Sequence, residues 1–69
     1  MTVQSDLKRA LAAAESAKGS YATFAAATED QLAKTMFLQM GQDMDSHIQQ
    51  LNSRLSYLNS VNPMNKDKV

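Results

Sequence analysis

Apolar residues recur at steps of three and four along two long stretches of this 69-residue chain. Such spacing places the apolar side chains on one face of a helix. No stretch alternates apolar and polar residues for long enough to predict a strand, and only two glycines and one proline interrupt the pattern. The sequence therefore predicts an all-α protein. The residues expected in the core or in a dimer interface are Leu7, Leu11, Ala14, Tyr21, Phe24, Phe37, Met40, Met44, Ile48, Leu51, Leu55 and Leu58.

Capping residues predict where the helices begin and end. Thr2 or Ser5 can cap the first helix, because their hydroxyl oxygens accept hydrogen bonds from free backbone N–H groups. Thr28 and Gln31 match a capping box, which predicts a second helix directly after Thr28; one uninterrupted helix through Thr28 is the competing interpretation. Pro63 ends the second helix. The expected organisation is a hairpin over residues 1–62, with helices at about 3–27 and about 29–60, and a polar tail over 63–69.

The apolar faces of the two helices are wider than a single helix–helix seam needs. Leu11 lies beside the first apolar stripe, and Leu32 and Met36 lie beside the second. Faces of this width need further neighbours in water. A second copy of the chain is the simplest neighbour, so we expect a homodimer in which two hairpins form a four-helix bundle. The alanine-rich segments LAAAESAKG and FAAAT give the first helix a thin surface that another backbone can approach closely.

Charge and composition argue against several classes of function. Seven basic and seven acidic residues cancel, which argues against binding to nucleic acid or to anionic lipid. The absence of cysteine excludes disulfides and a thiolate zinc site. No run approaches the roughly 20 apolar residues of a membrane-spanning helix. Charged residues also interrupt the segment MTVQSDLKRALAAAES, so it does not have the pattern of a signal peptide. We therefore expect a soluble cytoplasmic protein with no direct membrane span.

The only histidine lies in the segment MGQDMDSHI on the second predicted helix. If the turn lies near Thr28, residues whose numbers sum to about 56 face each other. Glu15 then lies opposite Gly41 and His47 opposite about Ala10, so Glu15 and His47 approach the same region of the bundle. This pair resembles the ligands of ferritin- and rubrerythrin-like di-iron bundles, which place Glu on one helix and Glu-x-x-His on its neighbour. Met44 stands where that pattern has its glutamate. The resemblance therefore implies at most a degenerate metal site, with Glu15 and His47 as the candidates, and no cofactor is expected.

Structural roles are the alternatives for these residues. His47 can pair with Asp43, one helical turn away, or lie at the edge of the core, and Glu15 can pair with Lys18. A hairpin offers no concave pocket or oxyanion hole to turn its serines and its histidine into a catalytic set. No glycine-rich phosphate loop is present in the sequence. We therefore expect no catalytic residues and a non-enzymatic protein.

The segments TVQSDLKRAL, AESAKGSYATFA, TEDQLAK and MDSHIQQLNSRLSYLN resemble a family of short helical proteins of unknown function from spore-forming Firmicutes. The resemblance extends to about Asn62. It implies a spore-related context, because family members occur beside genes of the stage V sporulation membrane-channel operon and some are fused to membrane domains. The resemblance thus implies a structural or protein-interaction module in the forespore or spore, with a spore membrane-associated protein as partner. It assigns no catalytic residues. The alternative is a degenerate ferritin-like metal-binding bundle.

Overall fold

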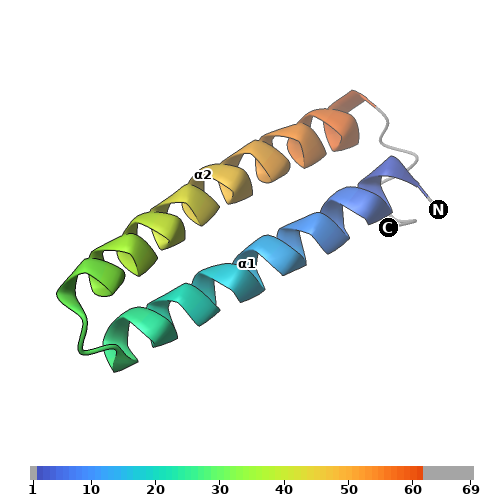
Figure 1. Cartoon of the computed structure of the whole chain (residues 1–69). Coiled ribbons are helices and arrows are strands. Elements are labelled where there is room, and N and C mark those ends of the chain that lie inside the picture. Colours follow the sequence, from blue (N-terminus) through green and yellow to red (C-terminus); the bar gives the residue numbers. More distant parts are fainter. Residues whose placement is uncertain (1, 62–69) are drawn as a thin grey trace.

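Two helices form an antiparallel hairpin in the computed structural model, which describes residues 2–61: α1 (Val3–Ala27) and α2 (Gln31–Val61) (Figure 1). The hairpin is 50 Å long and 16 by 13 Å in cross-section, measured on Cα atoms. Such a cross-section is two helices wide and one helix deep, so no further layer of the described part of the chain covers the outer faces. Over residues 2–61, neither helix has an apolar run long enough to cross a lipid bilayer. The all-α antiparallel hairpin predicted from the sequence is confirmed.

Threonine side chains flank both ends of α1. The Thr2 hydroxyl oxygen accepts a hydrogen bond of 3.0 Å from the backbone N–H of Ser5, so Thr2 is the N-cap and Ser5 lies inside the helix. At the other end, the backbone N–H of Thr28 donates to the carbonyl oxygen of Phe24 at 3.0 Å. The backbone of Thr28 is extended, which ends the helix there. An uninterrupted helix through residue 28 is therefore excluded.

The cap of α2 differs from the prediction. Asp30, not Thr28, caps the helix: its carboxylate oxygen Oδ1 accepts from the backbone N–H groups of Leu32 at 3.0 Å and Ala33 at 3.4 Å. The Thr28 hydroxyl oxygen instead accepts from the N–H of Asp30 at 3.2 Å, which tightens the connection between the helices. α2 therefore begins at Gln31, two residues later than the expected start at about residue 29. The predicted stop at Pro63 and the predicted tail lie outside the described residues.

Replacing Asp30 with alanine is expected to lower the free energy of unfolding by about 1 kcal/mol, because two N–H groups of the first turn of α2 lose their acceptor. Thermal melting followed by circular dichroism measures the loss. Glu29→Ala is the matched control, because it removes an adjacent acid whose side chain caps nothing. Equal losses for the two variants would show that charge near the helix N-terminus, and not the cap, provides the stabilisation.

The core lies along the seam between α1 and α2. Ala14, Ala25 and Leu55 are its buried apolar residues, and no side chain of the described residues is fully buried. The rings of Phe24 and Phe37 meet across the seam with centroids 5.5 Å apart, in the tilted geometry that aromatic pairs favour. Gln4 and Ala25 continue the core at the ends of α1, although neither was among the residues predicted there. The seam of one hairpin therefore encloses little apolar surface.

The twelve residues predicted for the core or a dimer interface differ widely in exposure. Ala14 and Leu55 are buried, whereas the Phe24 side chain is 49% exposed. Nine others are partly buried: Leu7, Leu11, Tyr21, Phe37, Met40, Met44, Ile48, Leu51 and Leu58. A half-buried side chain has gained only part of the stabilisation that full burial provides. The hairpin leaves most of these residues with apolar surface that a further neighbour can cover.

Gly41 lies beside the seam but has no close neighbour that requires a glycine. A Cβ atom built on Gly41 meets nothing within 4 Å, and the same holds for Gly19. Gly41→Ala is therefore expected to raise the free energy of unfolding by roughly 0.5–1 kcal/mol, because alanine loses less backbone entropy in a helix. Chemical unfolding at fixed protein concentration measures the gain. A loss of stability would show that another chain approaches the backbone at Gly41.

Candidate functional site

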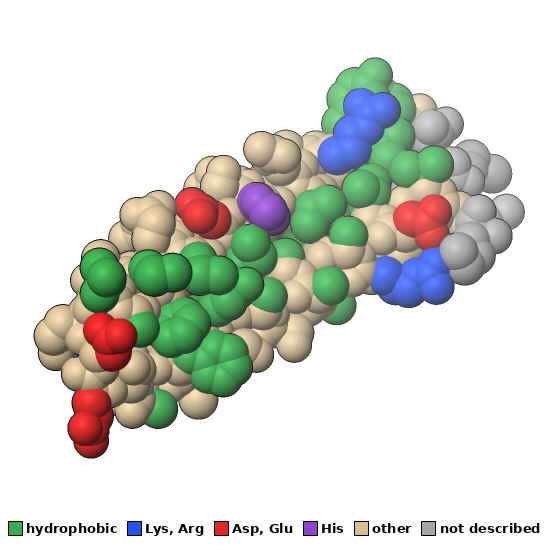
Figure 2. Space-filling model, viewed as in Figure 1, with side chains coloured by type: hydrophobic (Ala, Val, Ile, Leu, Met, Phe, Trp, Pro, Cys, Tyr) green, Lys and Arg blue, Asp and Glu red, His purple; other side chains and the backbone are tan. Residues whose placement is uncertain are grey.

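Three of the four large exposed apolar side chains near the turn share one side of the hairpin, and the fourth, Leu38, lies on the other. Phe24, Leu32 and Met36 are 49%, 72% and 56% exposed, and we call these three residues the apolar ridge. Figure 2 shows apolar side chains gathered over both helices near the turn, on the side of the molecule that carries the histidine. Isolated surface hydrophobic residues are common, but a contiguous group of this kind marks an interaction surface.

A hollow lies on the same side, further from the turn. We call it the alanine hollow; its residues are Ala10, Ala13, Ala14 and Ala17 of α1, and Met44, His47, Gln50 and Leu51 of α2. The alanines have no side chain beyond Cβ, so α1 is thin along this segment and leaves a volume of about 500 Å³. Phe24 follows Ala17 by two helical turns, which places the apolar ridge and the alanine hollow on one face. We call this side of the hairpin the hollow face.

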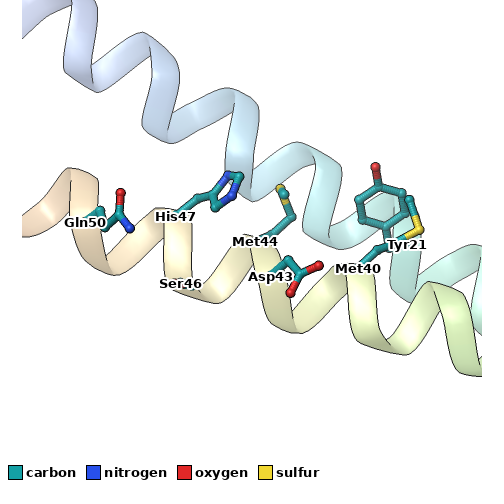
Figure 3. Close-up of a pocket in the computed structure, with 7 residues that line it drawn as sticks. All are labelled: Tyr21, Met40, Asp43, Met44, Ser46, His47 and Gln50. Atoms are coloured by element: carbon teal, nitrogen blue, oxygen red, sulfur yellow. The ribbon is translucent and has the colours of Figure 1, made fainter.

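A second hollow continues the first toward the turn (Figure 3). It has a volume of about 360 Å³ and shares Met44, His47 and Gln50 with the alanine hollow. Tyr21 reaches it from α1, and Met40 lies beside it on α2. Methionine adapts its shape to an irregular neighbour, which suits a surface that another molecule covers. Asp43 and Ser46 also line this second hollow, so polar side chains border the hollow face between the ridge and the alanines.

The other side of the seam carries an ion pair. Lys18 of α1 and Asp45 of α2 form an ion pair of 2.6 Å across it, with both side chains about half exposed. Lys34 and Leu38 lie on this side with Ala22 and Ala26. Leu38 is its one large exposed apolar side chain among the described residues. An exposed ion pair contributes little to stability, but it keeps charge on this side of the hairpin.

The candidate metal residues do not assemble into a site. His47 is exposed on the hollow face, and Glu15 is exposed next to the buried Ala14. Phe24 meets Phe37 and not the residue near 32 that the predicted register implies. In this register Glu15 and His47 lie at a similar level of the hairpin, but Glu15 is not among the residues that line the hollows beside His47. Within residues 2–61, no three His, Asp or Glu side chains come together in a way that could hold a metal ion.

Neither of the ion pairs considered for these residues forms as the sequence suggested. Lys18 pairs with Asp45 and not with Glu15. The carboxylate of Asp43 accepts a hydrogen bond from the side-chain amide of Gln39 at 3.2 Å. His47 shares a hollow with Asp43 and stays open to solvent. His47 is therefore part of the apolar hollow face, with its imidazole at the surface.

The fold and this surface define a class of protein: a small helical hairpin whose most prominent chemical feature is an uncovered apolar face. The chain belongs to the family described as protein of unknown function DUF1657, whose model matches residues 7–55, more than half of the chain. The match confirms the family resemblance and includes every residue of the alanine hollow. No curated protein and no solved structure matches the sequence.

Proposed function

We propose that the hairpin is a non-enzymatic structural and protein-interaction module that acts as a homodimer, in which two hairpins pack hollow face against hollow face into a four-helix bundle. One observation carries the proposal: over residues 2–61 no large apolar side chain is fully buried in the single hairpin, although 43% of the residues of the chain are hydrophobic. A chain of this size has little stability to spare. Pairing adds apolar burial to every residue of the hollow face at once.

Two features favour a second copy as the neighbour. A two-fold axis makes one apolar face cover another of the same size, so a single interface buries the apolar faces of both copies. The formal net charge of the chain is zero, so two copies do not repel each other through excess charge. A four-helix bundle is the architecture that two such hairpins form.

Light scattering on the purified chain tests the dimer. The expected mass is twice the chain mass of 7.6 kDa. The melting temperature should also rise with protein concentration, because mass action favours the associated state. A mass of one chain at micromolar concentration, with full helical content and a melting temperature that does not depend on concentration, would overturn the proposal.

We further propose that the module serves in the forespore or spore, in membrane assembly, germination or resistance, through a membrane-associated partner. The family resemblance to proteins of spore-forming Firmicutes supports this role. The dimer would act by presenting a fixed surface to that partner, with no reaction of its own. Crosslinking followed by capture from sporulating cells tests it. Recovery of a spore membrane protein in amounts matching the dimer supports the role, whereas recovery of soluble proteins alone overturns it.

A further inference from the structure

We infer that the two hairpins of the dimer pair with their turns at opposite ends, and that the apolar ridge of each copy fills the alanine hollow of the other. This inference rests on the proposed dimer and specifies its geometry. A two-fold dimer that packs these faces has two arrangements, with the turns together or with the turns apart. Shape and charge on the hollow face discriminate between them.

Shape is the first argument. The ridge lies near the turn, and the alanine hollow lies further along the hairpin. If the turns were together, symmetry would place ridge at the level of ridge and hollow opposite hollow, leaving both hollows unfilled. If the turns are apart, the ridge of each copy meets the hollow of the other copy. A cavity of about 150 Å³ can hold one benzene-sized ring, so the hollow of about 500 Å³ has room for the ring of Phe24 and the thioether of Met36 together.

Residue spacings in α1 and in α2 predict the same alignment of one hairpin along its partner. Phe24 and Ala13 are eleven residues apart in α1, and Met36 and His47 are eleven residues apart in α2. Eleven residues make about three helical turns, so each pair lies on one side of its helix. One antiparallel alignment therefore places Phe24 over the partner's Ala13 and Met36 beside the partner's His47. The symmetry axis then passes near residue 19 of α1 and between residues 41 and 42 of α2.

Charged side chains at the two ends of the hairpin also discriminate between the two arrangements. Glu29 and Asp30 lie at the turn, whereas Arg54 lies on α2 seven residues after His47, on the same side of the helix. The alignment set by the ridge brings the acidic turn beside the partner's Arg54. Figure 2 shows two acidic side chains at the turn end; near the other end it shows two cationic groups, one of them beside an acidic side chain.

Arg54 is exposed, and its guanidinium lies 5.1 Å from the centre of the Tyr57 ring. Stacking on a ring leaves the N–H donors at the edge of the guanidinium able to reach a carboxylate. With the turns together, the acids of both copies would be neighbours and would repel each other. Shape and charge therefore favour the same arrangement.

Distances between paired spin labels test the geometry. The chain has no cysteine, so single-cysteine variants label one site per copy. Ser56→Cys and Gln42→Cys lie on exposed positions of α2. With the turns apart, the labels at position 56 are expected roughly 40 Å or more from each other, because each lies about 14 residues from the axis. The distance between the two labels at position 42 is expected to be below about 30 Å, which is the width of the bundle plus the label arms.

Three results are distinguishable when light scattering is measured on the same labelled samples. A dimer with a long distance at position 56 and a short one at position 42 supports the inference. A dimer with short distances at both positions places the turns together, which overturns the inference and leaves the proposed dimer intact. A mass of one chain without a dipolar signal overturns the proposed dimer and this geometry with it.

Discussion

Replacing Ala13 with arginine is expected to weaken dimerisation by roughly 100-fold or more and to leave monomers at micromolar concentration. Ala13 is exposed in the single hairpin and lines the alanine hollow. In the proposed dimer, an arginine there fills the space of the partner's Phe24 and places a charge in an apolar contact. Each clash costs about 1–3 kcal/mol, and two-fold symmetry produces it twice. Sedimentation equilibrium measures the change in the dissociation constant.

Ala12→Arg is the matched control for this variant. Ala12 is exposed, adjacent in sequence and also alanine, but it points about 100° away around α1, off the hollow face. The same charge at Ala12 is expected to leave the dimer unchanged, and both variants should keep the helical content of the original chain. Dissociation by both variants would indicate a general charge effect. A dimer that survives Ala13→Arg would show that the hollow face is not the interface.

Local signals in the sequence predicted the helices well. The steps of three and four, together with Thr2, predicted α1 over its whole length. The start of α2 was wrong by two residues, because Thr28 and Gln31 match a capping box while Asp30 offers a carboxylate two and three residues before the free N–H groups. Several polar residues in a row compete for a cap, and only the backbone path decides among them. Helix boundaries are therefore the least predictable part of this fold.

The relation between the helices could not be derived from the pattern alone. A shift of a few residues in the facing register decides which side chains meet across the seam. The observed register differs from the predicted one, so Phe24 meets Phe37 and not the residue near 32. This register brings Glu15 and His47 to a similar level, but His47 lines the hollows and Glu15 does not, and no group of three ligand side chains forms within residues 2–61. Periodicity determines which face of a helix is apolar, whereas the loop determines what that face meets.

The alanine hollow was only partly predictable. The alanine-rich segments of α1 indicated a thin surface, but whether a thin surface forms a hollow depends on the side chains opposite it. In the structure, Met44, His47 and Leu51 of α2 border the alanines and form the walls of the hollow. The predicted interface includes Ala14 but not Ala10, Ala13 or Ala17. In a surface that receives a partner, small residues are as informative as large ones.

Leu55→Ala is expected to remove most of the stability of the folded chain. The side chain of Leu55 is only 7% exposed, which makes it the most buried large apolar residue among those described. Replacing a buried leucine with alanine typically costs about 2–5 kcal/mol, from lost burial and from the cavity that remains. A small domain with little core has a total stability of similar size. Urea unfolding followed by circular dichroism is expected to show a largely unfolded chain at room temperature.

Leu38→Ala makes the same chemical change on the side of the seam that carries the ion pair of Lys18 and Asp45. Leu38 is 56% exposed, so its loss is expected to change the free energy of unfolding by about 0.5 kcal/mol or less. The comparison separates burial at the seam from the general cost of losing a leucine. Similar losses for both variants would mean that the seam between α1 and α2 is not the main source of stability. A large loss for Leu55 alone would show that the hairpin depends on its own seam, because Leu55 is buried before any partner is added.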